Sequence, residues 1–154
     1  MIASKETPWR YLVKRPAAAQ FAAWKASAES GEAFEAYLIG RCYEEGWRTR
    51  RDERKALFWY RVAAGGGCRE AFYFVAALLA WGSNEDMRQP KLALQYFQRA
   101  ARLGDRDALY QLGCAYLDGD GVGVNRRKGL ELLRKSASMG SEHARTAIQQ
   151  LRGR

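Results

Sequence analysis

A period of 36 or 37 residues runs through this chain of 154 residues and constrains its fold more than any other feature. The period is marked by four glycines, each of which comes shortly after a pair of small residues. These glycines are Gly31, Gly67, Gly104 and Gly140. A repeat of this length is typical of solenoid proteins, in which each repeat is one supersecondary unit stacked on its neighbours. The period therefore predicts a stack of similar units.

Each period contains two segments with the apolar spacing of a helix. In these segments apolar residues recur at three- and four-residue steps, which places them on one helical face. Asp52 and Asn125 are favoured N-cap residues, and Pro90 suits the first turn of a helix. One further helix is expected at each end of the chain, over residues 17–28 and 141–151. The paired helices are expected over residues 32–45 and 52–64, 69–81 and 90–102, and 106–117 and 125–138.

Small residues recur at fixed positions in the first helix of each pair. Gly40, Ala76 and Gly113 share one position, although a glycine inside a helix costs about 1 kcal/mol relative to alanine. We expect the two backbones of a pair to approach closely there, which compensates for that cost. A glycine also follows each first helix and is expected to end it as a left-handed cap. These capping glycines are Gly46, Gly82 and Gly119.

The recurring motifs point to a known family of repeats. Residues 108–113 read Ala-Leu-Tyr-Gln-Leu-Gly and are followed by Tyr116, Gly119, Gly121-Val122 and Asn125. Residues 52–64 contain Lys55-Ala56, Trp59-Tyr60 and Ala63-Ala64. These motifs resemble the two halves of the SEL-one-like repeat, a relative of the tetratricopeptide repeat, and the resemblance covers about residues 17–151. The sequence departs from the family pattern at Glu35, Ala76 and Gly129.

The period and the resemblance together predict an all-α fold. We expect a right-handed α-solenoid of stacked antiparallel helix pairs, with three full repeats and a half repeat at each end. Residues 1–154 are expected to form a single repeat domain. Its expected parts are an N-terminal extension (1–16), an unpaired helix (17–30), three repeats (31–66, 67–103 and 104–139) and a capping helix (140–152).

No set of residues has the spacing of a catalytic or metal site. His143 is the only histidine and lies in the expected last helix, where a surface or capping role is favoured over that of a base. Cys42, Cys68 and Cys114 lack the spacing of a zinc site, and their odd number does not favour a disulfide framework. The sequence therefore predicts a protein that is not an enzyme and that holds no metal or cofactor.

The resemblance implies a binding surface. In tetratricopeptide repeats the first helix of each pair lines a concave groove, and groove residues would recur at matching positions of each repeat. Three tyrosines share one such position, and tyrosine is favoured in interfaces. The sequence leaves open whether these tyrosines line the groove or pack in the core. The predicted groove residues are Tyr37, Arg41, Tyr73, Trp81, Tyr110 and Asp118.

Positive charge gathers at the expected loops between paired helices. The chain has 26 basic and 17 acidic residues, and its formal net charge of +9 favours acidic partners such as nucleic acid, anionic lipid or an acidic protein face. Repeat geometry would place the basic loops along one edge of the stack, as an interaction surface or simply as a solvated face. The predicted basic-edge residues are Arg48, Arg50, Arg51, Arg126 and Arg127.

These patterns favour a protein–protein adaptor or scaffold, a role that the resemblance places mostly in bacteria. The expected partner is a peptide or helix held in the groove. The alternatives are a solenoid that binds nucleic acid through the basic edge and a regulatory subunit of a separate enzyme. The amino terminus lacks the pattern of a secretion signal, and the longest apolar run is shorter than the roughly 20 residues of a membrane span, so a cytoplasmic protein is expected.

Overall fold

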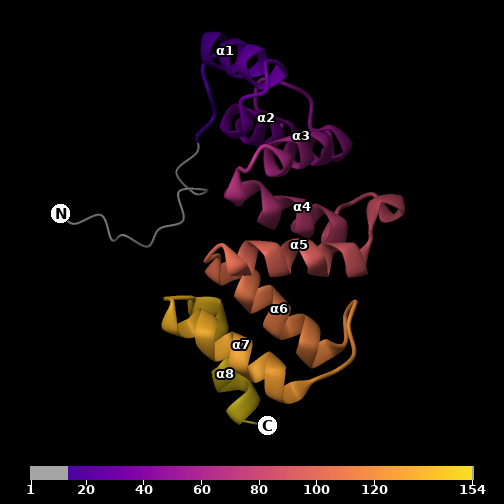
Figure 1. Ribbon diagram of the computed structural model, residues 1–154, viewed down its shortest axis with the longest axis vertical. Coiled ribbons are helices and arrows are strands. Elements are labelled where there is room, and N and C mark those ends of the chain that lie inside the picture. Colours follow the sequence, from indigo (N-terminus) through magenta and orange to yellow (C-terminus); the bar gives the residue numbers. More distant parts are fainter. Residues whose placement is uncertain (1–13, 154) are drawn as a thin grey trace, which may run out of the picture.

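The computed structural model describes residues 14–153, which form eight α-helices and one short 3-10 helix (Figure 1). The helices stack in chain order, and the described residues contain no β-strand. The predicted all-α fold of stacked helix pairs is therefore confirmed, while residues 1–13 of the expected N-terminal extension lie outside the described residues. The helices are α1 (Ala18–Glu29), α2 (Ala33–Glu45), α3 (Glu53–Gly65), α4 (Arg69–Trp81), η2 (Glu85–Met87), α5 (Pro90–Arg102), α6 (Arg106–Asp118), α7 (Arg126–Ser138) and α8 (Glu142–Arg152).

The stack is built from three helix pairs and a single helix at each end. Helix α2 packs with α3, α4 with α5, and α6 with α7, and the chain reverses direction within each pair (Figure 1). Each pair then contacts the next through α3 with α4 and α5 with α6. Helix α1 packs on α2 and helix α8 packs on α7. The observed bounds agree with the helices expected from the sequence to within one residue at each end.

Side-chain caps explain where the second helices of the pairs begin. The Asp52 side chain accepts a hydrogen bond from the backbone N–H of Lys55 at 3.0 Å, and the Asn125 side chain accepts one from that of Lys128 at 3.0 Å. Pro90 opens α5, where the N–H that proline lacks would have no partner within the helix. The three helix starts predicted from these residues are confirmed.

The glycines that mark the period lie where the chain turns from one pair to the next. Gly31, Gly67 and Gly104 have φ angles of 106°, 91° and 88°, a left-handed region that favours glycine. A Cβ atom at any of these three positions would meet nothing within 4 Å. The backbone turn itself, and not a close neighbour, therefore requires glycine at this point of the repeat.

Gly82 does not form the left-handed cap that the sequence predicts. Gly46 and Gly119 end α2 and α6 with φ angles of 71° and 78°, as expected, but Gly82 ends α4 with a φ of −52°. The chain leaves α4 in an extended direction because the following loop is longer and contains η2. A Cβ atom at Gly82 would come within 2.6 Å of the Leu78 carbonyl oxygen. A close backbone contact therefore requires the glycine here.

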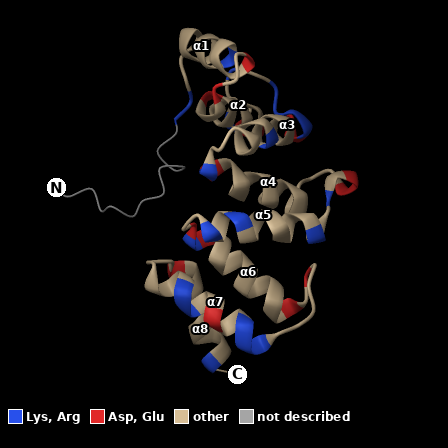
Figure 2. Ribbon diagram, in the orientation of Figure 1, with Lys and Arg blue, Asp and Glu red and all other residues tan. Residues whose placement is uncertain are grey.

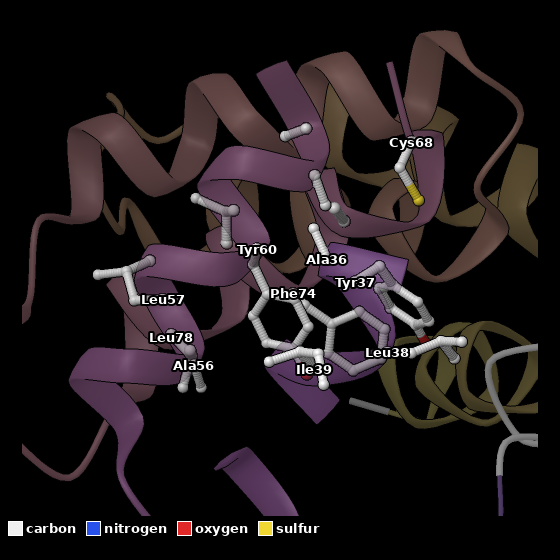
Figure 3. Packing of buried hydrophobic residues seen from close by; sticks show 14 of the residues in the cluster. Ala36, Tyr37, Leu38, Ile39, Ala56, Leu57, Tyr60, Cys68, Phe74 and Leu78 are labelled. Atoms are coloured by element: carbon white, nitrogen blue, oxygen red, sulfur yellow. The ribbon is translucent and has the colours of Figure 1, made fainter. Parts of the chain in front are cut away.

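Glycines also bring the helices of a pair together. A Cβ atom at Gly40 in α2 would lie 2.6 Å from ring carbons of Tyr60 in α3. At Gly113 in α6 it would lie 2.8 Å from a methyl carbon of Leu133 in α7. The predicted close approach of paired helices is confirmed at both positions. The Tyr60 ring that approaches Gly40 is part of the buried hydrophobic cluster (Figure 3).

Candidate functional site

Tyr37 lies in the core and not in a groove. Its side chain is fully buried, with ring centroids 5.8 Å from Tyr60 and 5.5 Å from Phe74 (Figure 3). The rings of Tyr60 and Phe74 stack on one another at 5.1 Å, so the three rings join α2, α3 and α4. The prediction that Tyr37 lines the groove is wrong, because the position that it occupies falls inside this aromatic cluster.

Arg41 is held within the protein by its neighbours on α2 and α4. Its side chain is only 11% exposed and forms ion pairs with Glu45 at 2.9 Å and with Glu44 at 3.6 Å. Its guanidinium carbon lies 4.9 Å from the centroid of the Phe74 ring. Arg41 is therefore largely engaged within the protein, and its predicted groove role stays a prediction.

Tyr73 joins two parts of the core. Its ring makes edge contacts with Phe74 and with Phe97 of α5, each at a centroid distance of 5.6 Å. The side chain is half-buried and packs against both hydrophobic clusters of the stack. Of the two interpretations that the sequence left open for the tyrosines, core packing holds for Tyr37 and in large part for Tyr73.

The other three predicted groove residues line one open pocket. Trp81 at the end of α4, Tyr110 on α6 and Asp118 at the end of α6 enclose a cavity of about 420 Å³ together with the first half of α5. Trp81 is 50% exposed, and its ring lies 5.5 Å from that of Phe97. We call this cavity the α4–α6 pocket. The residues used below to describe it are Ala80, Trp81, Phe97, Tyr110, Cys114, Asp118 and Asp120.

Helix α6 presents its pocket residues at regular steps. Tyr110, Cys114 and Asp118 follow one another at four-residue intervals, which places them on one face of the helix. The N-terminal end of this face is fixed by Asp105, whose carboxylate accepts hydrogen bonds from the backbone N–H groups of Asp107 and Ala108. The rigid, capped helix therefore sets the spacing of an aromatic ring, a thiol and a carboxylate along one wall.

The thiol and the phenol on the pocket wall both have raised pKa values. Burial raises the pKa of the Cys114 thiol, and the charge of Asp118 raises it further. Burial also raises the pKa of the Tyr110 phenol, as do Cys114 and Asp118. Both groups are therefore neutral at neutral pH, and a neutral thiol is a weak nucleophile and metal ligand. Residues 14–153 contain no cluster of three or more metal-ligating side chains.

The predicted basic edge is a surface of mixed charge. The loops that join paired helices all lie at one side of the stack, where both basic and acidic residues are present (Figure 2). Arg51 pairs with Glu53 at 3.1 Å, and Arg54 pairs with Asp86. Arg48 donates a hydrogen bond from Nε to the carbonyl oxygen of Pro16 at 2.8 Å. Much of the positive charge at this edge is therefore balanced or occupied within the protein.

Three basic-edge residues are exposed and form neither an ion pair nor a side-chain hydrogen bond with any residue of the described range. They are Arg50, Arg126 and Arg127. They lie at the starts of α3 and α7, and the α4–α5 pair with the acidic residues of η2 lies between these two helices. A nucleic-acid strand needs a continuous row of cations to neutralise successive phosphates. Lys91, an exposed residue at the start of α5, is a further cation between the two groups, so nucleic-acid binding at this edge stays an alternative.

The comparison with known families agrees with the repeat found in the sequence and in the stack. The Sel1 repeat pattern matches residues 36–68, 70–105 and 106–141, which together make up more than half of the chain. The chain belongs to the Sel1 repeat family. This is the SEL-one-like repeat that the motifs resemble, and three repeats are present.

The chain is similar to solved and curated proteins. The crystal structure of a Sel1 repeat protein from Oxalobacter formigenes has a TM-score of 0.71 at 29% identity and covers 84% of this chain and 96% of that one. The ERAD-associated E3 ubiquitin-protein ligase component HRD3B of Arabidopsis thaliana is 36% identical over 96 residues, which is 62% of this chain and 15% of the plant protein. The chitin synthase regulator SKT5 of Saccharomyces cerevisiae is 27% identical over 139 residues, 85% of this chain and 20% of the yeast protein. This chain therefore spans a small fraction of either curated relative.

The sequence indicated only part of the pocket of this Sel1 repeat protein. Phe97 and Asp120 also line the pocket but are not among the predicted groove residues. The structure brings both to the pocket because the second helix of one repeat forms the floor beneath the first helix of the next. For Phe97, the available signal was its repeat position, which matches that of Tyr60 37 residues earlier. None of the described helices is long and apolar enough to cross a membrane.

Proposed function

We propose that this Sel1 repeat protein is a non-enzymatic adaptor or scaffold that binds a peptide or helix of a partner protein in its groove. The α4–α6 pocket is the point at which the partner anchors. One observation carries the proposal: Trp81 is 50% exposed at the mouth of an open cavity whose other walls include Phe97 and Tyr110. Exposed aromatic side chains beside a pocket are the usual anchors of protein interfaces.

The names of the relatives support a second candidate function, that of a subunit of an enzyme complex. One relative is named as a component of a ubiquitin ligase, and another as a regulator of chitin synthase. Such a role is compatible with the first, because a subunit that regulates an enzyme also binds it through a protein surface. As part of the same proposal we place the protein in the cytoplasm, which is supported by its three free cysteines.

Selection from a random peptide library displayed on phage tests the proposed function with the full chain. We expect enrichment of peptides that bind the purified protein, and Trp81→Ala should weaken the binding of the enriched peptides by at least about tenfold. Phe58→Ala is the matched control, because Phe58 is an equally exposed aromatic residue (58%) on α3, outside the pocket. It should leave binding within about twofold of the original.

The outcome that contradicts the proposal is also specific. If selection yields no binding peptide, or if the enriched peptides bind Trp81→Ala as tightly as the unmodified chain, then the pocket is not the anchoring point. Circular dichroism of both variants shows whether they keep the helical stack, so that lost binding is not mistaken for unfolding.

A further inference from the structure

We propose that the α4–α6 pocket receives an arginine side chain of the partner, an inference that rests on the proposed function and names the chemistry that the pocket recognises. The argument comes from a comparison of two neighbouring repeats. The space between α2 and α4 is filled by an arginine of this chain. The equivalent space between α4 and α6 is open.

The period relates the side chains of the two spaces. Arg41 and Glu44 on α2 correspond to Ala77 and Ala80 on α4, 36 residues later in the sequence. Tyr60 on α3 corresponds to Phe97 on α5, which forms part of the pocket. The exchange of two long charged side chains for two alanines removes the groups that fill the first space. The cavity of about 420 Å³ lies where these groups are missing.

The first repeat shows how the fold accommodates a guanidinium in this position. Arg41 lies over the ring of Phe74, with the guanidinium carbon 4.9 Å from the ring centroid, and forms ion pairs with Glu44 and Glu45. This arrangement suits arginine in particular. The face of its planar guanidinium stacks on an aromatic ring, while the N–H groups at its edge donate hydrogen bonds to a carboxylate.

The α4–α6 pocket offers the same two kinds of group without the cation. Trp81 and Tyr110 supply aromatic faces on opposite helices, and Trp is the best aromatic partner for a cation. Asp118 and Asp120 supply two exposed carboxylates, and neither forms an ion pair with a residue of the described range. The described lining contains no lysine, arginine or histidine. The pocket is therefore complementary to a positively charged side chain.

Asp118 is also placed against the preference of its own helix. It is the last residue of α6, where the helix dipole disfavours a negative charge, and the last turn of α6 contains no basic residue. Its carboxylate therefore gains nothing from the helix that carries it. A cation from a partner would supply the missing favourable interaction.

Peptides from the library selection serve as the probes, and the arginine of each is replaced in turn by citrulline, its neutral isostere, and by norleucine. We expect the peptides that depend on Trp81 to share an arginine. Citrulline should weaken binding to the unmodified protein by about tenfold, as expected for loss of a charge-assisted hydrogen bond. Against the double variant Asp118→Asn, Asp120→Asn, the arginine and citrulline peptides should bind equally.

Two further variants separate this arrangement from a general effect of charge. Glu131→Gln removes an exposed carboxylate of α7 outside the pocket and should leave the preference for arginine unchanged. The double variant Ala77→Arg, Ala80→Glu copies the pair Arg41 and Glu44 into the second repeat. It should fold and lose binding of the arginine peptide, because its own guanidinium occupies the space.

The inference and the proposed function can fail separately. Two results would overturn the arginine pocket and leave the adaptor function intact. In the first, peptides that need Trp81 bind equally tightly when norleucine replaces their arginine. In the second, these peptides bind the Asp118→Asn, Asp120→Asn variant as tightly as the unmodified protein. Tighter peptide binding by Arg10→Gln, which changes an arginine of this chain's own amino-terminal segment, would assign the pocket to that segment instead of to a separate partner. Absence of any peptide that depends on Trp81 would overturn both proposals.

Discussion

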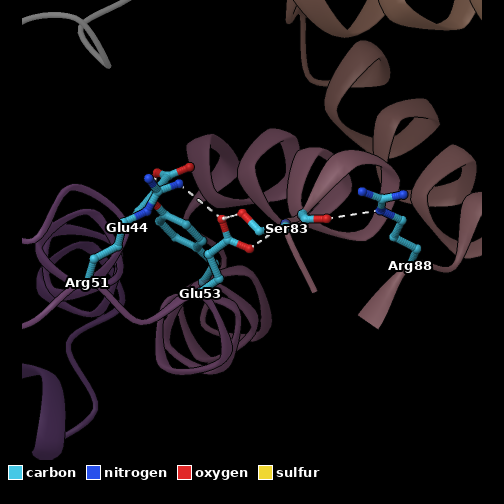
Figure 4. A network of polar contacts seen from close by, with 7 residues as sticks. Glu44, Arg51, Glu53, Ser83 and Arg88 are labelled. Carbon is cyan, nitrogen blue, oxygen red and sulfur yellow. Dashed lines mark hydrogen bonds and ion pairs between the residues drawn. The ribbon is translucent and has the colours of Figure 1, made fainter. Parts of the chain in front are cut away.

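The carboxylate of Glu53 accepts two hydrogen bonds from Ser83, one from its backbone N–H at 2.7 Å and one from its hydroxyl at 2.8 Å (Figure 4). Glu53 is the first residue of α3, and Ser83 lies in the loop that follows α4. The two hydrogen bonds therefore connect the start of α3 to the loop between α4 and α5. Arg51 adds an ion pair at 3.1 Å, and Arg88 holds the same loop by a hydrogen bond to the Gly82 carbonyl oxygen. This contact fixes the loop that follows Trp81 and thereby one side of the pocket.

Replacement of Glu53 by Gln should destabilise the fold. Glu53 is buried, and the substitution removes the charge from the acceptor of both Ser83 bonds, so we expect a loss of about 1–3 kcal/mol in the free energy of unfolding. Urea denaturation followed by circular dichroism measures this loss. Glu131→Gln, an exposed acidic residue of α7, is the matched control and should change stability by less than about 0.5 kcal/mol. Equal stability of the two variants would contradict the role given to Glu53.

The contribution of Glu53 should also depend on pH. Burial alone would raise the pKa of this carboxyl, but the hydrogen bonds from Ser83 and the charge of Arg51 outweigh burial and lower the pKa. A lowered folded pKa means that the stabilisation is complete above the unfolded value of about 4.3 and is lost as the pH falls through the folded value. The stability difference between the unmodified chain and Glu53→Gln should therefore be largest near neutral pH and shrink in acid. If this stability difference grows in acid, then the pKa of Glu53 is not lowered in the folded protein.

Replacement of Gly40 by alanine should destabilise the first helix pair, although alanine is the better helix former. The new Cβ atom would lie 2.6 Å from the ring of Tyr60, which is buried and cannot move away freely. We expect a net loss of about 1–3 kcal/mol. Gly65→Ala is the matched control, because Gly65 is also helical and a Cβ atom there meets nothing within 4 Å. That change should be neutral or should stabilise the fold by up to about 1 kcal/mol.

Thermal unfolding of the two alanine variants decides between close packing and simple helix propensity. If the melting temperature of Gly40→Ala equals or exceeds that of Gly65→Ala, then the new Cβ atom does not clash with Tyr60 as predicted. The close approach of α2 and α3 would then need another explanation.

The three cysteines should differ in their reaction with iodoacetamide. Burial raises the pKa of Cys42 to about 11 and, with Glu70 nearby, that of Cys68 to about 12. Cys114 is partly exposed on the pocket wall, so it should be modified first, and faster as the pH rises, because only the thiolate reacts. Mass spectrometry of proteolytic peptides measures each rate. Modification of Cys42 in the folded protein as fast as that of Cys114 would contradict the buried position of Cys42.

Charge reversal at the basic edge tests the nucleic-acid alternative. The triple variant Arg50→Glu, Arg126→Glu, Arg127→Glu changes the three basic-edge arginines that are exposed and form neither an ion pair nor a side-chain hydrogen bond within the described range. It should leave binding of the peptides that depend on Trp81 within about twofold, since rim charges distant from an anchor contribute little. Fluorescence anisotropy with a labelled DNA duplex should show only weak, salt-sensitive binding by the unmodified chain. Tight duplex binding that the triple variant loses would favour the nucleic-acid function.

Much of this fold follows from short-range features of the chain. Positive-φ glycines such as Gly31 and Gly67, caps such as Asp52, and apolar residues at helical steps act within one or two turns of the backbone, so the sequence alone determined the helices, their pairing and the family. The small residue at Gly40 likewise indicates the close approach of α2 and α3 from the sequence alone. Helix caps, turn glycines and apolar spacing can be recognised from the sequence because they depend mainly on residues that are close in the chain.

Only the tertiary structure decided which repeated positions are buried and which line a pocket. Tyr37 and Tyr110 share one position of the repeat, yet the first is enclosed by Tyr60 and Phe74 while the second lines the pocket. The difference arises from side chains on other helices, because the rings of Tyr60 and Phe74 cover Tyr37, whereas the small side chain of Ala80 on α4 leaves open space beside Tyr110. Burial is a property of the whole packed neighbourhood, and a periodic pattern read along one chain does not contain it.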